Sequence, residues 1–117
     1  KAFIKGTNSA ASLTTSDFKN AQEISITSID DFFSGKNDVI GLIKLDVEGE
    51  ELGVIKGALE TIKRDKPILL ISVYHRPEDF FFIKPLIDDL NLGYKFMIRK
   101  TSSFRVTSET VLIGYSG

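Results

Sequence analysis

The chain has 117 residues, of which 42% are hydrophobic and 26% are charged, and its formal net charge is -1. This composition predicts one folded domain with one core and argues against disorder. Fifteen basic residues against sixteen acidic ones leave no basic surface for nucleic acid. The absence of cysteine excludes disulfides and thiolate metal sites. No apolar run approaches the roughly 20 residues of a membrane span, so a cytoplasmic protein is expected.

The N-terminal third predicts two short strands separated by a loop. Lys1–Lys5 alternates apolar and polar residues, as a strand does. Residues 6–22 are rich in Gly, Ser, Thr and Asn, which indicates a loop. Isoleucines on a period near two favour a strand over Glu23–Ile29. Residues 30–33 are expected to form a short helical turn that ends at Gly35.

The middle of the chain predicts a strand, a helix and a second strand. Val39–Asp46 is almost continuously apolar, as expected of a strand covered on both faces. After Gly49, a helix with an apolar stripe is expected from residue 50 to residue 66, where Pro67 ends it. Ile68–Tyr74 is a second buried strand. Because a helix joins them, the two strands should be parallel.

The C-terminal third predicts one helix and two strands. Pro77 suits the first position of a helix that Pro85 should kink or divide. Tyr94–Arg99 and Thr110–Tyr115 are strands, and their short connection predicts antiparallel pairing. The expected fold is α/β, with a mostly parallel sheet and one antiparallel strand near the C-terminus.

Acidic residues and the only histidine follow the two central strands. Asp46 and Glu48 come after the first strand, and His75 comes after the second. Ligands of open α/β sheets bind at the carboxyl ends of parallel strands, which favours a shared site for these three residues. An alternative for Glu48 is a role at the N-terminus of the following helix. That structural role is the favoured interpretation for Glu50 and Glu51.

A divalent cation is a second hypothesis for this site. Two carboxylates and one imidazole would suit Mg²⁺, Mn²⁺ or Fe²⁺. An acid-x-acid pattern at a strand-to-helix turn is nevertheless common without metal, so no residue is assigned as a metal ligand. The sequence contains neither a GxSxG motif nor a cysteine nucleophile, and it has no phosphate-binding loop.

The stretches "IKLDVEGEELGVIKGA" (Ile43–Ala58) and "ISVYHRPED" (Ile71–Asp79) closely resemble the motifs of FkbM-type methyltransferases. The final strands "GYKFMIRK" and "ETVLIGY" resemble the last strands of that family. The resemblance implies a Rossmann-like sheet and an S-adenosylmethionine-dependent O-methyltransferase that acts on a hydroxyl of a sugar or natural product. By position, Asp46, Glu48 and Glu51 match the acidic motif of the family, and His75 matches its later histidine.

The glycine-rich loop that holds the cofactor in this family is absent from the sequence. The resemblance therefore implies that residues 1–117 are a single domain forming the C-terminal part of a methyltransferase, inactive alone, with Asp46 at the edge of the donor pocket. His75 is the hypothesised base or acceptor-positioning group, with Asp46 and Glu48 holding the acceptor or a metal. The alternative is an inactive half-domain that acts as an interaction module and dimerises through an exposed sheet edge.

Overall fold

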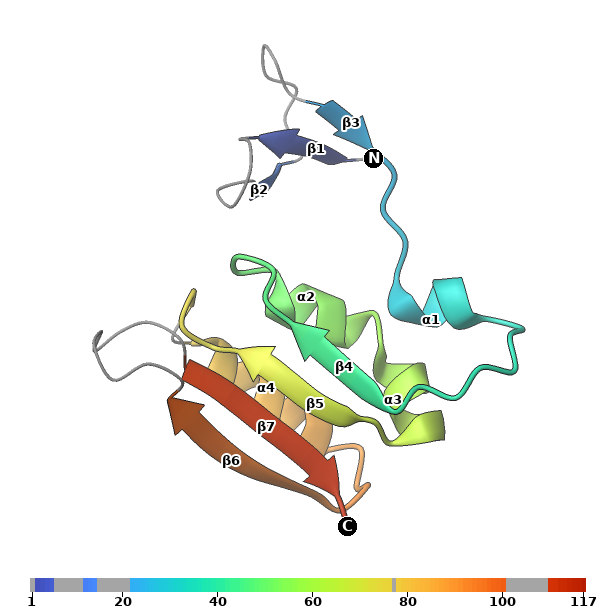
Figure 1. The fold of residues 1–117 in the computed structure, drawn as a ribbon, viewed down its shortest axis with the longest axis vertical. Coiled ribbons are helices and arrows are strands. Elements are labelled where there is room, and N and C mark those ends of the chain that lie inside the picture. Colours follow the sequence, from blue (N-terminus) through green and yellow to red (C-terminus); the bar gives the residue numbers. More distant parts are fainter. Residues whose placement is uncertain (1, 6–11, 15–21, 77, 101–109) are drawn as a thin grey trace.

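The computed structural model describes residues 2–5, 12–14, 22–76, 78–100 and 110–117. Its first three strands form a small antiparallel sheet in the order β2-β1-β3 (Figure 1). These strands are β1 (Ala2–Lys5), β2 (Ser12–Thr14) and β3 (Gln22–Ile24). The first expected strand is confirmed over the described residues. The expected loop contains β2, and the strand expected at 23–29 is shorter than predicted.

The main sheet has four strands in the order β4-β5-β7-β6. The strands are β4 (Leu42–Leu45), β5 (Ile68–Ser72), β6 (Tyr94–Lys100) and β7 (Thr110–Ser116). The parallel pairing of β4 with β5 and the antiparallel pairing of β6 with β7 are both confirmed. The expectation of a mostly parallel sheet is wrong, because β7 lies between β5 and β6 and runs antiparallel to both. Only one of the three described strand pairings in the main sheet is parallel.

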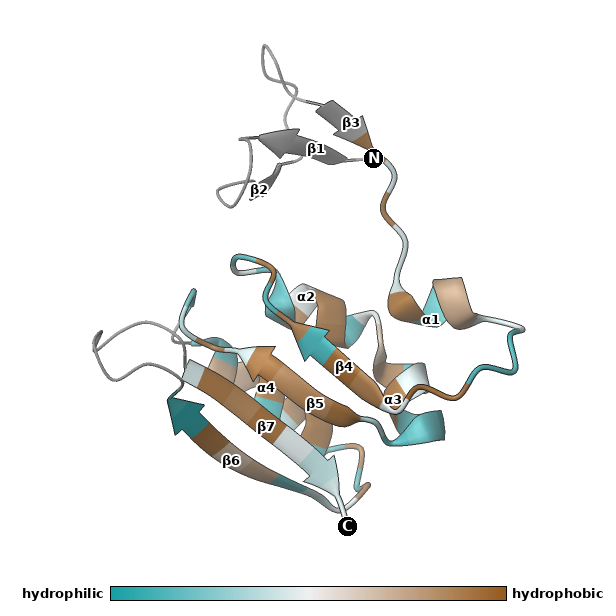
Figure 2. Ribbon diagram, in the orientation of Figure 1, coloured by the Kyte–Doolittle hydropathy of each residue, from teal (hydrophilic) through white to brown (hydrophobic). Residues whose placement is uncertain are grey.

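Three helices cover one face of the main sheet, as Figure 1 shows. They are α2 (Glu51–Lys56), α3 (Leu59–Asp65) and α4 (Asp79–Asp88). The core lies between these helices and the sheet. In Figure 2 hydrophobic residues dominate β5 and the central part of β7. The buried hydrophobic residues are Ile43, Leu45, Ile55, Ala58, Ile62, Leu69, Ile71, Val73, Ile83, Ile87 and Leu112.

The opposite face of the main sheet is open in the part of the chain that the structure describes. Leu42 and Ile68, which are register partners, are 53% and 48% exposed. The expectation that the first central strand is covered on both faces is therefore wrong. Its burial alternates along the strand, with Ile43 and Leu45 buried. A continuous apolar run does not reveal whether both faces or only one are covered in this chain.

The single helix expected from residue 50 to residue 66 is divided into α2 and α3. The division lies at Gly57, whose carbonyl accepts a hydrogen bond of 2.9 Å from the backbone N–H of Asp30. Asp30 belongs to α1 (Ile29–Phe33), the expected helical turn, which begins at the N-cap Ser28. A Cβ on Gly57 would lie 3.0 Å from the Cβ of Ser28. The glycine thus allows α1 to approach the division closely.

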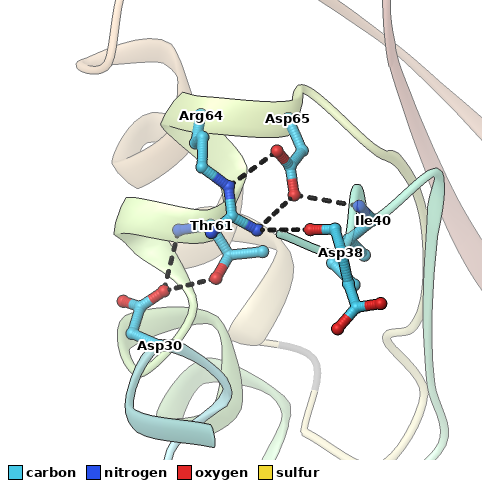
Figure 3. Close-up of polar contacts among 6 residues, drawn as sticks. All are labelled: Asp30, Asp38, Ile40, Thr61, Arg64 and Asp65. Carbon is cyan, nitrogen blue, oxygen red and sulfur yellow. Dashed lines mark hydrogen bonds and ion pairs between the residues drawn. The ribbon is translucent and has the colours of Figure 1, made fainter. Parts of the chain in front are cut away.

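The Asp30 side chain caps α3 from outside that helix (Figure 3). One carboxylate oxygen accepts from the backbone N–H and the hydroxyl of Thr61, both at 2.8 Å. The other accepts from the backbone N–H of Glu60 at 3.1 Å. Burial opposes ionisation of Asp30, but these hydrogen bonds and the charge of Lys63 outweigh it and lower the pKa of the carboxyl. Asp30 therefore replaces the capping side chain that the N-cap residue of α3, Ala58, lacks.

A second carboxylate joins the end of α3 to the segment that leads into β4 (Figure 3). Asp65 accepts from Nε and Nη2 of Arg64, both at 2.7 Å, and from the backbone N–H of Ile40 at 2.9 Å. Arg64 also donates to the carbonyl of Asp38 at 3.1 Å. The Arg64 guanidinium and the Ile40 hydrogen bond lower the pKa of Asp65 to about 2. These contacts fix where β4 enters the sheet.

The last helix, α4, continues through Pro85, so this proline does not divide the helix, and the alternative expectation of a kink stays a prediction. Pro77 and the connection at residues 101–109 lie outside the described residues. None of the described helices is long and apolar enough to cross a membrane.

Replacing Asp30 with alanine should reduce the free energy of unfolding by about 1–2 kcal/mol, because the first N–H groups of α3 lose their acceptor. Urea unfolding followed by circular dichroism measures this change. Asp31→Ala is the matched control, since Asp31 is an exposed aspartate of α1, the helix that also contains Asp30. This variant should change the free energy of unfolding by less than about 0.5 kcal/mol. Equal losses in the two variants would contradict the capping role of Asp30.

Candidate functional site

Four side chains meet at the carboxyl ends of β4 and β5. Asp46 follows β4 directly, Glu48 lies in the turn after it, and Glu51 is the first residue of α2. His75 follows β5. Because β4 and β5 are parallel, their carboxyl ends lie at the same edge of the sheet. We call Asp46, Glu48, Glu51 and His75 the acid–histidine cluster. The structure thus brings together the three residues that the strand-end argument selected.

The turn between β4 and α2 depends on two residues with positive φ. Glu48 has φ of 54° and Gly49 has φ of 98°. A Cβ on Gly49 would lie 2.9 Å from Nε of Arg76. Glycine therefore permits both the backbone conformation and the close approach of the chain that follows β5. The tight turn places Glu48 and Glu51 on either side of the imidazole.

The imidazole of His75 contacts a different carboxylate through each nitrogen. Nδ1 lies 2.9 Å from Oε1 of Glu51. On the other side of the ring, Nε2 lies 3.2 Å from Oε2 of Glu48 and 3.8 Å from Oδ1 of Asp46. The Glu51 side chain is fully buried, whereas those of Asp46 and Glu48 are 47% and 51% exposed. His75 therefore has one buried partner and two partners that face solvent.

The contacts of Glu51 indicate how the ring is protonated. Oε1 of Glu51 also accepts the backbone N–H of Val47 at 3.1 Å. An ionised Glu51 can only accept, so beside it His75 donates from Nδ1, and the lone pair of Nε2 in the neutral ring is directed toward Glu48 and Asp46. A proton taken up by Nε2 would be stabilised by these two carboxylates.

Tyr74 supports the exposed side of the cluster. Its hydroxyl donates to Oδ1 of Asp46 at 3.1 Å. Its ring centroid lies 4.0 Å from that of His75, with a tilt of 41° between the planes. Tyr74 thus fixes Asp46 through a hydrogen bond and restricts the imidazole by ring contact.

The strand-end argument missed Glu51 and Tyr74. The strand-end argument favoured a role for Glu51 at the helix N-terminus, and only the family resemblance placed this residue in the acidic motif. In the structure Glu51 is fully buried and contacts His75. A signal was present in the sequence, because Glu51 lies four residues before the buried Ile55 and thus on the inward face of α2. The contact between Tyr74 and Asp46 depends on strand register, and the sequence carries no comparable signal for it.

A metal ion is not assigned at the cluster. Potential ligand atoms of Asp46, Glu51 and His75 lie within 4.8 Å of one another, a spacing that would admit a divalent cation. The hydrogen bond between Glu51 and His75 produces part of the same spacing without a cation.

A mainly apolar pocket of about 270 Å³ lies between residues 26–29 and α2, and none of the four cluster residues lines it.

Gly49 and Gly53 provide a matched test of the turn. Gly49→Ala should lower the free energy of unfolding by about 1–3 kcal/mol, because alanine is strained at a φ of 98°. Gly53 lies inside α2, and a Cβ there would meet only Oε2 of Glu50, at 3.8 Å. Gly53→Ala should therefore be neutral or gain up to about 1 kcal/mol. Similar losses in both variants, measured by urea unfolding, would contradict the account of the turn.

Comparisons with known proteins identify the family of the chain. A search of curated proteins found no match. A crystal structure of the methyltransferase FkbM from Methylobacillus flagellatus KT is similar to this chain, with 34% sequence identity and a TM-score of 0.64. The similarity covers 74% of this chain and 22% of that one, so this chain spans much less than the full length of its structural neighbour. The family described as the Methyltransferase FkbM domain matches residues 2–96. The chain therefore belongs to the FkbM methyltransferase family.

Proposed function

We propose that this chain forms the acceptor side of an S-adenosylmethionine-dependent O-methyltransferase and that the acid–histidine cluster carries its proton chemistry. The observation that supports the proposal most strongly is the orientation of His75. A fully buried carboxylate holds Nδ1, and Nε2 points to the solvent-facing side of the site. A histidine held in this way can accept a proton from a bound hydroxyl.

The residues at the cluster fit a hydroxyl-bearing acceptor better than a complete donor pocket. Carboxylates, an imidazole and a phenol converge there, and these groups accept hydrogen bonds from hydroxyls. We propose Asp46, at the end of β4, as the residue that also reaches the edge of the donor. The glycine-rich loop of the family is absent from the sequence. This absence supports assignment of the chain to the C-terminal part of a methyltransferase domain and suggests that the chain alone is inactive.

In the proposed reaction, S-adenosylmethionine supplies an electrophilic methyl group when it is bound. Asp46 and Glu48 position the acceptor hydroxyl near Nε2 of His75. When the carbon–sulfur bond of the donor breaks, leaving a neutral thioether, and the hydroxyl oxygen bonds to the methyl carbon, Nε2 would take the hydroxyl proton, and the two carboxylates would stabilise the resulting imidazolium. Glu51 keeps the ring in place while the charge on it changes. The class of acceptor that we propose is a sugar or natural-product hydroxyl.

A non-catalytic interaction module is the alternative function. It is favoured by the open sheet face that carries Leu42 and Ile68 and by the free edge of β4 in the described sheet. Apolar surface beside an unpaired strand edge is a surface on which a second copy of the chain could pair. Such a module would not depend on the orientation of His75.

His75→Ala in a complete enzyme that carries this chain should lower kcat by about 10²–10⁴-fold, the usual contribution of a general base. The measurement is transfer of a radiolabelled methyl group from S-adenosylmethionine to hydroxyl-bearing acceptors. Glu60→Gln, an exposed carboxylate on α3, is the control and should leave kcat unchanged. An unchanged kcat in the His75 variant would remove the base assignment.

A further inference from the structure

Two buried carboxyl oxygens have no hydrogen-bond partner in the described part of the chain. They are Oε2 of Glu51 and Oδ2 of Asp79. The two residues are 0% and 3% exposed, respectively. A buried carboxylate oxygen without a donor is costly, and the large majority of buried polar atoms in proteins are satisfied. Two such oxygens therefore require an explanation.

Both oxygens belong to the first residues of helices that pack together. Glu51 begins α2, Asp79 begins α4, and these two helices are in contact. Burial raises the pKa of the Asp79 carboxyl, and the negative charge of Glu51 raises it further. Among the other charged groups, Arg76 opposes this effect, whereas Glu78 and Glu50 add to it. The two carboxyls therefore lie within electrostatic range of each other.

We propose that Asp79 is protonated in the folded chain and donates a hydrogen bond to Oε2 of Glu51. Asp79 is then a positioning residue for His75. One hydrogen bond would satisfy both unpartnered oxygens. The buried pair would then carry one negative charge instead of two, which removes the electrostatic repulsion between the two carboxylates. The hydrogen bond between Asp79 and Glu51 is independent of the proposed function, whereas its catalytic meaning rests on the proposal that His75 is the base.

The consequence for the site is a chain of three directed hydrogen bonds. Asp79 donates to Oε2 of Glu51, while His75 and the backbone of Val47 donate to Oε1. Glu51 stays ionised because the proton of the pair resides on Asp79. An ionised Glu51 is an acceptor only, so it fixes Nδ1 of His75 as a donor and leaves Nε2 available.

Carboxyl ¹³C NMR of the purified chain tests the proton on Asp79 without methyl donor or acceptor. The expected result is that the Asp79 carboxyl keeps the ¹³C chemical shift of its protonated form at pH values above ~3.9, the ordinary pKa of aspartate. Titration of Asp79 within or below that range would overturn the proposal. Because no turnover is measured, failure here is distinct from failure of the proposed methyl transfer.

Two variants test the positioning role through the Nδ1–H proton of His75, which is the only histidine in the chain. Asp79→Asn retains a donor to Glu51 and should leave the exchange rate of this proton with solvent unchanged. Asp79→Leu removes the donor and should raise that rate at least roughly fivefold, the effect of losing one typical hydrogen bond. Equal exchange rates in the asparagine and leucine variants would overturn the proposal. If the leucine variant does not fold, the asparagine variant decides alone: faster exchange of the Nδ1–H proton in Asp79→Asn than in the wild type would overturn the proposal.

Discussion

The candidate site depends on one hydrogen bond, between the buried carboxylate of Glu51 and Nδ1 of His75. A carboxylate with no exposed surface is stable only when donors satisfy it, and the described donors to Glu51 are the imidazole and the backbone of Val47. Both donors follow from the fold: Val47 continues from β4, and His75 follows the parallel strand β5. The same constraint directs Nε2 toward Glu48 and Asp46.

The polar contacts at the two ends of α3 support this arrangement from a distance. Asp65 joins the end of α3 to the segment that enters β4, while Asp30 caps the start of α3 from α1. Together these contacts fix the helix pair against β4, and the start of α2 carries Glu51. The helices cover one face of the main sheet and leave Leu42 and Ile68 on the open face. The site thus lies at the carboxyl ends of β4 and β5, whereas Leu42 and Ile68 are exposed on the open face of the same two strands.

Patterns local in sequence predicted much of the fold. Alternation and apolar runs indicated all four strands of the main sheet, and the strand–helix–strand order predicted the parallel pair that unites Asp46 with His75. The position of β7 between β5 and β6 was not predictable, because pairing order depends on contacts distant in sequence. The division at Gly57 was missed for a similar reason: it depends on the docking of α1. The inward position of Glu51 was signalled by its spacing of four residues from Ile55, but a carboxylate at a helix start is ordinarily exposed, and its contact with His75 became visible only in the structure.

The most direct test of this account is the tautomer of His75, measured by long-range ¹H–¹⁵N NMR of the purified chain. As the only histidine in the sequence, it gives an unambiguous signal. At about pH 8.5, which is above the ordinary pKa range of an imidazole, we expect the neutral ring to carry its proton on Nδ1. A ring protonated mainly on Nε2 would contradict the account, because Glu51 would then not hold His75, and the lone pair would face the interior instead of the acceptor.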